Sequence, residues 1–363
     1  MRGMMGGQAG LLFAGMASFI LMGAGQSLYG PALPVFGREM GLSLADASLV
    51  ISAHWVGCFI GVAVMFVAGH LATPRRVLAL MAAGAALIAA GWGWPVTLIG
   101  ATVFGTGYGG STVLFNPRFL AAFGDRGPSM LSLLNATFGI GAIAAPLVFV
   151  ALGSQPGLGY GLIAGLCLLV LLGAQDAGRV AVKVETVERL RPDALILTFG
   201  LFGVGMEACL IGLGPAALVR AGETEATSAA LLSAFFVAFL GARVVLTFAA
   251  HLIAPFRLYL IAVGGIGACM ILAAVSVPDW FFVPAGAFAG MIFPGYFVEA
   301  LARMGHGPRV APVVVGAGLI GGIGAPLVLA RLVEALGTRG FFWCLGALGL
   351  VLLALGLLVM RRR

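Results

Sequence analysis

Long apolar runs alternate with short polar connectors along the whole chain. A bilayer core of roughly 30 Å requires about 20 consecutive apolar residues in a helix, and twelve runs are near that length or longer. The runs are continuous and lack the alternation typical of membrane-barrel strands, which favours helices. We therefore predict an all-α membrane protein with twelve transmembrane helices, at residues 10–36, 47–70, 76–93, 96–121, 129–152, 157–174, 194–220, 227–250, 255–276, 279–303, 309–336 and 339–360.

The composition supports a membrane protein. Of 363 residues, 61% are hydrophobic and only 9% are charged, and the mean hydropathy is +1.12. Soluble domains carry about 25% charged residues, so this chain lacks the polar side chains needed to cover its surface in water. Soluble enzymes, soluble nucleic-acid binders and disordered scaffolds are therefore excluded.

The basic residues predict the orientation of the helices. Of the 20 lysines and arginines, fifteen lie at one side of the predicted spans, three lie at the other side, and Arg243 and Arg331 lie within spans. The positive-inside rule places the fifteen in the cytoplasm, so both termini are expected on the cytoplasmic side of a cell inner membrane. The net charge of +7 then reflects topology, and we expect no nucleic acid as a partner. The fifteen residues are Arg2, Arg75, Arg76, Arg118, Arg126, Arg179, Lys183, Arg189, Arg191, Arg257, Arg303, Arg309, Arg361, Arg362 and Arg363.

The sequence carries no pattern that predicts catalysis or a cofactor. It has no nucleotide-binding P-loop and no His-Glu-x-x-His pattern. The glycine-rich stretch at 107–110 lies inside a predicted span and not between a strand and a helix. We therefore predict a protein that is not an enzyme, binds no metal or cofactor, and uses no ATP. The five cysteines all lie in predicted spans without metal-ligand spacing: Cys58, Cys167, Cys209, Cys269 and Cys344.

One long charged connector divides the predicted spans into six and six. It covers residues 175–193, which we predict to be a cytoplasmic linker between an N-terminal six-helix bundle at 1–174 and a C-terminal six-helix bundle at 194–363. The two halves also share short segments in the same order, separated by 180–184 residues. Because the separation spans six helices, the two repeats have the same orientation in the membrane. The matching pairs are 30–33 with 214–218, 68–76 with 249–257, 127–128 with 307–308, and 139–142 with 322–325.

Twelve spans, a central linker and parallel repeats resemble the major facilitator superfamily of transporters. The loop signature of that family, Gly-x-Leu-Ala-Asp-Arg-x-Gly-Arg/Lys, is similar to Gly69-His70-Leu71-Ala72-Thr73-Pro74-Arg75-Arg76, with Thr73 at the acidic position and Pro74 at the basic position that follows it. The resemblance implies a monomer that binds its substrate near the midplane between two halves and works by alternating access. It also implies a gating role for Arg75 and Arg76.

Shorter motifs resemble the fucose/glucose-type sugar permease branch of that superfamily. The resemblance implies uptake of a sugar-like solute together with protons. The acidic residues of the fucose-type pattern fall near Gly30 and Thr112 here, which argues against fucose itself as the substrate. The motifs are Phe115-Asn116-Pro117, 134–142, Gly203-Val204-Gly205-Met206-Glu207, Gly241-Ala242-Arg243 and Phe293-Pro294.

Ionisable residues inside apolar spans are candidates for function because burying them is costly. Glu207 lies at the middle of the seventh span, where we predict that it couples transport to protons; a structural hydrogen bond is the alternative. Arg243 in the eighth span pairs with Glu207, binds an anionic substrate, or extends to the membrane surface. Glu299 and Arg303 lie one helical turn apart and form either a gate or an ordinary ion pair. The candidate gating residues among these are Arg243, Glu299 and Arg303.

Uncharged polar and aromatic residues within the spans suit a small polar substrate. Sugar hydroxyl groups require hydrogen-bond donors and acceptors, and aromatic rings stack against sugar rings. The alternative is that these side chains form hydrogen bonds between helices. The candidate substrate-binding residues are Gln26, Trp55, Asn116, Asn135 and Tyr296.

These observations predict a secondary transporter that moves a small polar, sugar-like solute across the inner membrane, coupled to protons. Two alternatives within transport are an exporter of amphipathic drugs or metabolites and a facilitated-diffusion uniporter. A receptor or assembly factor that does not transport is the alternative outside transport, and it would not need the polar side chains within the spans.

Overall fold

The structure, a computed structural model, describes residues 2–68, 72–174, 191–249, 252–305 and 309–361. These residues form twelve α-helices and the short 3₁₀-helix η2 (Gly124–Arg126), and include no β-strand. The first six are α1 (Arg2–Met40), α2 (Leu44–Ala68), α3 (Pro74–Ala89), α4 (Trp94–Ala122), α5 (Gly127–Ala151) and α6 (Pro156–Gly173). The other six are α7 (Ala194–Arg220), α8 (Glu225–Ala249), α9 (Pro255–Val275), α10 (Pro278–Met304), α11 (Val310–Leu336) and α12 (Gly340–Arg361).

Eleven of the twelve helices in the described ranges are long and apolar enough to cross a membrane. This confirms the prediction of an all-α, multi-pass membrane protein. Helix α3 is the exception, because its 16 residues extend only about 24 Å at 1.5 Å per residue. The predicted span at 76–93 was wrong at its end: Gly91 and Gly93 have φ values of 65° and 102°, a left-handed backbone that stops the helix at Ala89.

Local sequence signals start several of the helices. Proline occupies the first turn of α3, α4, α6, α9 and α10, where its fixed φ suits the helix and its missing N–H costs no hydrogen bond. The Oγ1 atom of Thr73 accepts a hydrogen bond from the backbone N–H of Arg76 and caps α3. In the same way, the Asp193 carboxylate accepts from the N–H groups of Leu195 and Ile196 and caps α7.

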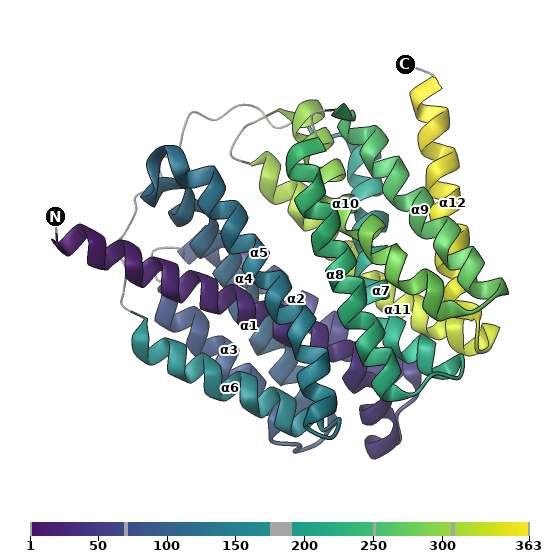
Figure 1. Cartoon of the computed structure of the whole chain (residues 1–363), viewed down its shortest axis with the longest axis horizontal. Helices are drawn as coiled ribbons and strands as arrows, with labels where there is room; N and C mark the ends of the chain where they lie inside the picture. The colour runs from purple at the N-terminus through teal and green to yellow at the C-terminus, as the bar shows by residue number, and fades with distance from the viewer. Residues whose placement is uncertain (1, 69–71, 175–190, 250–251, 306–308, 362–363) are drawn as a thin grey trace. The chain divides into compact units, whose positions relative to one another are not determined.

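The internal contacts divide the chain into two compact units. The first contains Met1–Leu42 and Leu49–Lys183, and the second contains Ser43–Ser48 and Val184–Arg363. In the first unit, α1 packs against α5, and α3 packs against both α4 and α6. In the second unit, α7 packs against α11, and α9 packs against both α10 and α12 (Figure 1). The same packing scheme therefore occurs twice, moved along the chain by six helices, as the sequence repeats suggested.

Close helix contacts repeat residue by residue. A Cβ atom built on Gly105 of α4 would overlap the carbonyl oxygen of His54 in α2. The corresponding contact in the second unit joins Gly286 of α10 to the carbonyl oxygen of Phe235 in α8. Each residue number is larger by 181, and only glycine permits the backbones to approach this closely. One turn further along the same helices, the matching contacts are Gly109 with Cys58 and Gly290 with Phe239.

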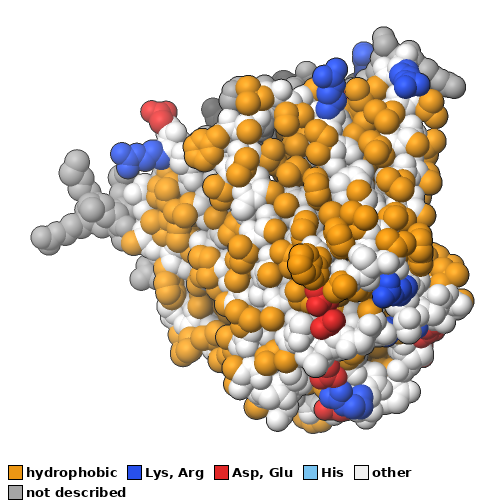
Figure 2. Space-filling view, turned by 45° about the vertical axis from the view of Figure 1, so that its right-hand side comes forward, with side chains coloured by type: hydrophobic (Ala, Val, Ile, Leu, Met, Phe, Trp, Pro, Cys, Tyr) orange, Lys and Arg blue, Asp and Glu red, His pale blue; other side chains and the backbone are white. Residues whose placement is uncertain are grey.

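Large apolar side chains are exposed along most helices. Examples are Leu172 in α6 and Phe248 in α8, each 75% exposed. Figure 2 shows one face of the molecule, on which hydrophobic side chains cover broad areas and charged side chains are few. Exposing such a surface to water is energetically unfavourable, whereas contact with the hydrocarbon of a bilayer is favourable. The chain is therefore a multi-pass membrane protein.

Candidate functional site

The first unit contains a buried cluster of polar and aromatic side chains drawn from α1, α2 and α4. His54 of α2 is 1% exposed; its Nδ1 atom lies 3.5 Å from the hydroxyl of Tyr29 and its Nε2 atom 3.6 Å from Cys58 Sγ. The His54 ring also meets Tyr108 edge to face at a centroid distance of 5.0 Å. Because the ring makes contacts on several sides, it fixes the position of Tyr108.

Two predicted substrate-binding residues belong to this cluster. The hydroxyl of Tyr108 donates a hydrogen bond of 2.8 Å to Oε1 of Gln26, and Trp55 packs against both His54 and Tyr108. Gln26 is 8% exposed, while Trp55 and Tyr108 are partly exposed. The cluster thus presents an amide, a phenol and an indole ring, which together offer hydrogen bonds and a stacking surface to a small polar molecule.

Asn116 and Asn135 lie apart from this cluster in the chain and differ in their surroundings. The Oδ1 atom of Asn116 in α4 is buried and has no hydrogen-bond partner in the described structure, so it retains an acceptor for a ligand or water. Asn135 in α5 is exposed and its Nδ2 donates to the carbonyl of Leu131 in its own helix. Asn116 is therefore the better placed of the two for binding.

The second unit holds two of the charged residues singled out in the sequence, for which an ion pair was one of three alternatives. Glu207 is partly buried in the middle of α7, a helix of 27 residues, and interacts electrostatically with Arg243 of α8. The Nε atom of Arg243 donates to the carbonyl of Gly290 at 3.2 Å, and its guanidinium lies 4.4 Å from the centre of the Phe239 ring. Arg243 is thus held at the close contact between α8 and α10, within the field of the Glu207 carboxylate.

Tyr296 of α10 is fully buried, and its hydroxyl donates to the carbonyl of Val314 in α11 at 2.8 Å. Its ring also fills the space above Gly200 of α7, where a Cβ atom would overlap it. In this conformation Tyr296 therefore connects three helices, and its hydroxyl is already engaged by the protein.

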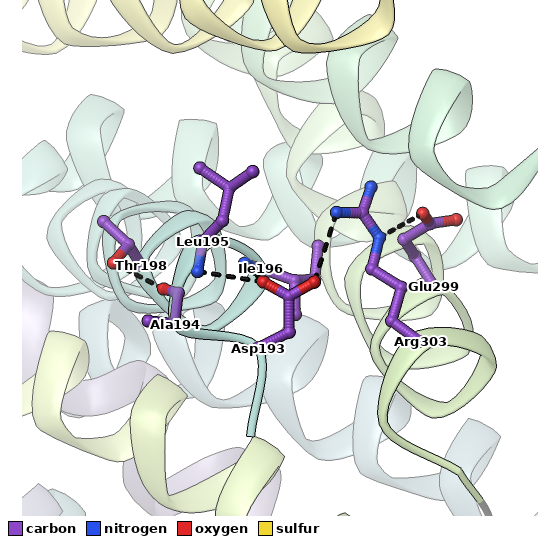
Figure 3. A network of polar contacts seen from close by, with 7 residues as sticks. All are labelled: Asp193, Ala194, Leu195, Ile196, Thr198, Glu299 and Arg303. Atoms are coloured by element: carbon purple, nitrogen blue, oxygen red, sulfur yellow. Dashed lines mark hydrogen bonds and ion pairs between the residues drawn. The ribbon is translucent and has the colours of Figure 1, made fainter. Parts of the chain in front are cut away.

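The predicted pair Glu299 and Arg303 is part of a larger network at the start of α7 and the end of α10 (Figure 3). Arg303 Nε donates to Glu299 Oε1 at 2.6 Å, and its Nη1 lies 3.5 Å from Asp193 Oδ2. The guanidinium also lies 5.0 Å from the centre of the Phe256 ring. Arg303 thereby connects the cap of α7 to the last turns of α10.

The arginines of the predicted gating loop lie at the start of α3. Arg75 Nε donates to the carbonyl of Ala174, at the end of α6, at 2.7 Å. The backbone N–H of Arg76 is bonded to Thr73, so the residue at the family's acidic position serves as a helix cap here. Residues 69–71 of the motif lie outside the described residues.

Sequence reasoning missed two participants in these contacts. Tyr29 is an isolated tyrosine in an apolar run, and nothing in its neighbourhood indicates that it faces His54. Asp193 ends the charged connector and resembles any other linker residue, although a carboxylate directly before an apolar helix is a recognisable cap signal. The described residues contain no group of three or more metal-ligating side chains.

Comparison with known families shows which protein family the chain belongs to. The sequence model of the Major Facilitator Superfamily matches residues 15–317. The chain belongs to the major facilitator superfamily. As a member, it is a membrane transporter and not an enzyme, and the repeated six-helix packing described above is the arrangement found in such transporters.

Solved structures of the same fold cover nearly the whole chain. The nucleoside transporter NupG is 14% identical, with a TM-score of 0.75 over 98% of this chain and 99% of that chain. A D-xylose-proton symporter is 12% identical, with a TM-score of 0.74 over 96% of each chain. A single-residue variant of the E. coli fucose:proton symporter FucP is 19% identical, with a TM-score of 0.61 over 95% of this chain and 97% of that chain. No curated protein sequence matches the chain.

Proposed function

We propose that this transporter carries a small polar, sugar-like solute across the inner membrane together with protons, as a monomer with both termini in the cytoplasm. Its two six-helix halves, at 1–174 and 194–363 and joined by a linker at 175–193, would alternate access to the substrate. The observation that carries the proposal is a carboxylate, Glu207, in the middle of an apolar helix beside Arg243. Two of the similar structures are of sugar–proton symporters and one is of a nucleoside transporter, which supports a polar ring as the substrate.

Glu207 supplies the proton-binding group in this proposal. The charged carboxylate is stabilised by Arg243, which also contacts the carbonyl of Gly290 and the Phe239 ring, and protonation of Glu207 would remove the attraction to Arg243. Protonation therefore changes the charge and the contacts between α7 and α8. An electrostatic change of this kind drives a conformational cycle only if the two states differ in proton affinity.

Uptake by purified protein in proteoliposomes tests the coupling. With an inward proton gradient, we expect the wild type to accumulate substrate and Glu207→Gln to equilibrate it without accumulation, because glutamine cannot exchange a proton. Glu39→Gln is the matched control, since it removes an exposed carboxylate near the end of α1 and should retain accumulation. Unchanged pH dependence in Glu207→Gln would overturn proton coupling through this residue, and a wild type that only equilibrates the substrate would indicate facilitated diffusion.

The substrate itself can be identified by thermal stability in mild detergent, because a ligand that binds only the folded protein raises Tm by mass action. The panel would contain monosaccharides, nucleosides, amino acids, organic acids and lipophilic cations. We expect a shift with a sugar or nucleoside; a shift with lipophilic cations alone would favour an exporter instead.

The polar cluster of the first unit can be tested with the solute that gives this shift. Tyr108→Phe removes the hydroxyl that donates to Gln26, and we expect a loss of affinity of about three- to tenfold, the value of one hydrogen bond. Tyr160→Phe is the control, because that buried hydroxyl donates to the carbonyl of Gly25 and should affect stability but not affinity. Equal affinity in the two variants would remove Tyr108 from the substrate site.

A further inference from the structure

A groove of about 440 Å³ runs between α9 and α12 of the second unit. Figure 1 shows the two helices side by side. The groove is apolar except at one end, where the side chain of Arg257 forms part of its wall. Its lining includes Arg257, Ile261, Gly264, Leu353, Leu357 and Met360.

Two glycines of α9 form part of the groove lining. Gly264 and Gly265 contribute no side chain to the groove, and a Cβ atom on Gly264 would approach Leu353 Cδ2 to 2.8 Å. The walls carry exposed apolar side chains: Ile261 is 47% exposed and Leu357 is 45% exposed. In a bilayer such a surface is in contact with hydrocarbon chains and not with water.

One arginine lines the charged end of the groove, and a second follows a lining residue in the sequence. Arg257 is in the first turn of α9, and Arg361 is the last described residue of the antiparallel helix α12, next to the lining residue Met360. Both are exposed, and within the described part of the chain neither makes a hydrogen bond or an ion pair. Their charge is therefore available to an anion from outside the protein.

We propose that this groove binds an anionic phospholipid, with one acyl chain between α9 and α12 and the phosphate group on Arg257 and Arg361. Basic pockets between transmembrane helices bind anionic headgroups, because the guanidinium and phosphate charges complement each other at the membrane surface. The C-terminal end of α12 places the headgroup in the leaflet that the charge distribution predicts to be cytoplasmic. A second copy of the chain fits this end less well, because the side predicted to be cytoplasmic carries fifteen basic residues in the sequence and two copies would repel.

Native mass spectrometry of the detergent-purified protein tests the proposal with defined lipids. The protein is mixed with phosphatidylglycerol or with phosphatidylethanolamine of the same acyl chains, and the lipid-bound fraction is measured. We expect retention of phosphatidylglycerol over phosphatidylethanolamine, and a loss of affinity of about fivefold for each of Arg257→Gln and Arg361→Gln, as expected for one basic residue near an anionic surface. Arg126→Gln is the control, since Arg126 is an exposed arginine in η2 of the first unit and does not line the groove.

A second variant tests the acyl chain separately from the headgroup. Ile261→Trp fills the groove but retains both arginines, and we expect it to lower lipid retention, whereas Leu169→Trp on the exposed face of α6 should not. Equal retention of both lipids, or full retention by the double variant R257Q/R361Q, would overturn the proposal and leave ordinary contact with bulk lipid. The result does not depend on which solute is transported.

Discussion

Several buried polar side chains in this protein contact partners that belong to other helices. His54 contacts Tyr29 from α1 and Tyr108 from α4, although all three residues lie within apolar runs. Tyr108 in turn donates to Gln26. Within the hydrocarbon of a bilayer there is no water to form hydrogen bonds with polar groups, so these groups must bond to each other. Each such pair therefore also fixes how its two helices pack.

Glu223 offers a test of such pairing outside the membrane spans. It follows α7, and desolvation together with the negative charge of Asp279 raises the pKa of its carboxyl. A carboxyl whose pKa is raised on folding binds its proton more tightly in the folded state, so it lowers stability as pH rises above its ordinary value. We expect Glu223→Gln to raise Tm at pH 7 and to have a smaller effect at pH 4.

The matched control is Glu225→Gln, two residues further along at the start of α8. Its carboxylate lies at a helix N-terminus, where negative charge is favourable. We therefore expect this variant to lose stability at pH 7. If the two variants behave alike, Glu223 and Asp279 do not repel each other.

Much of the candidate site could be predicted from the sequence when a residue was conspicuous in its own surroundings. Glu207 and Arg243 interrupt apolar runs, and the structure places them in one electrostatic pair. Tyr29 could not be found in this way, because a tyrosine is unremarkable in an apolar helix and its role depends on which helix it faces. The hydroxyl of Tyr296 looks equally suitable for a ligand in the sequence, but it donates to Val314 instead.

At the scale of the helices, most boundaries follow from turn chemistry. Apolar length predicted eleven of the described spans, and the proline and cap signals refine where they start. Helix α3 ends early because two glycines with a left-handed backbone conformation terminate it. The hydropathy pattern did not predict this end, because hydropathy does not depend on backbone conformation. The packing between helices was predictable only where glycine-containing segments repeat in the two halves. Elsewhere, the residues that neighbour a glycine in the sequence do not indicate which helix it contacts.

The start of α7 combines a helix cap with an ion pair, and the two contributions can be separated. Asp193→Asn retains a side-chain oxygen that accepts from the helix N–H groups but loses the attraction to Arg303, whose side chain is 9% exposed. We expect it to lower the free energy of unfolding by about 1 kcal/mol. Asp193→Ala loses the cap as well, which costs about 1 kcal/mol more.

Thermal or denaturant unfolding of Asp193→Asn, Arg303→Gln and the double variant measures the coupling of the pair. We expect the sum of the two single losses to exceed the loss in the double variant, because the double variant can lose the ion pair only once. Strict additivity would show that Asp193 acts through the cap alone, and that the 3.5 Å contact contributes nothing to stability.

At the scale of the whole molecule, charge and repeats carry different information. The six-helix repeat is present in both units as the same packing scheme, so the sequence repeat predicts how the helices pack. The bias of fifteen basic residues to one side reports on how the chain inserts, because positive loops are retained in the cytoplasm during insertion. The predicted orientation would account for a net charge of +7 in a chain with few charges.

The orientation that this bias predicts can be measured with single cysteines in a variant whose five native cysteines are replaced. Asp125→Cys introduces a thiol in η2, at a position predicted to be cytoplasmic, and Ser276→Cys introduces one after α9, at a position predicted to be outside the cell; both positions are exposed. In intact cells, a membrane-impermeant maleimide should label Ser276→Cys alone, and Asp125→Cys should react only after permeabilisation. The reverse pattern would place the termini outside the cell, and the lipid groove at Arg257 would then face the outer leaflet.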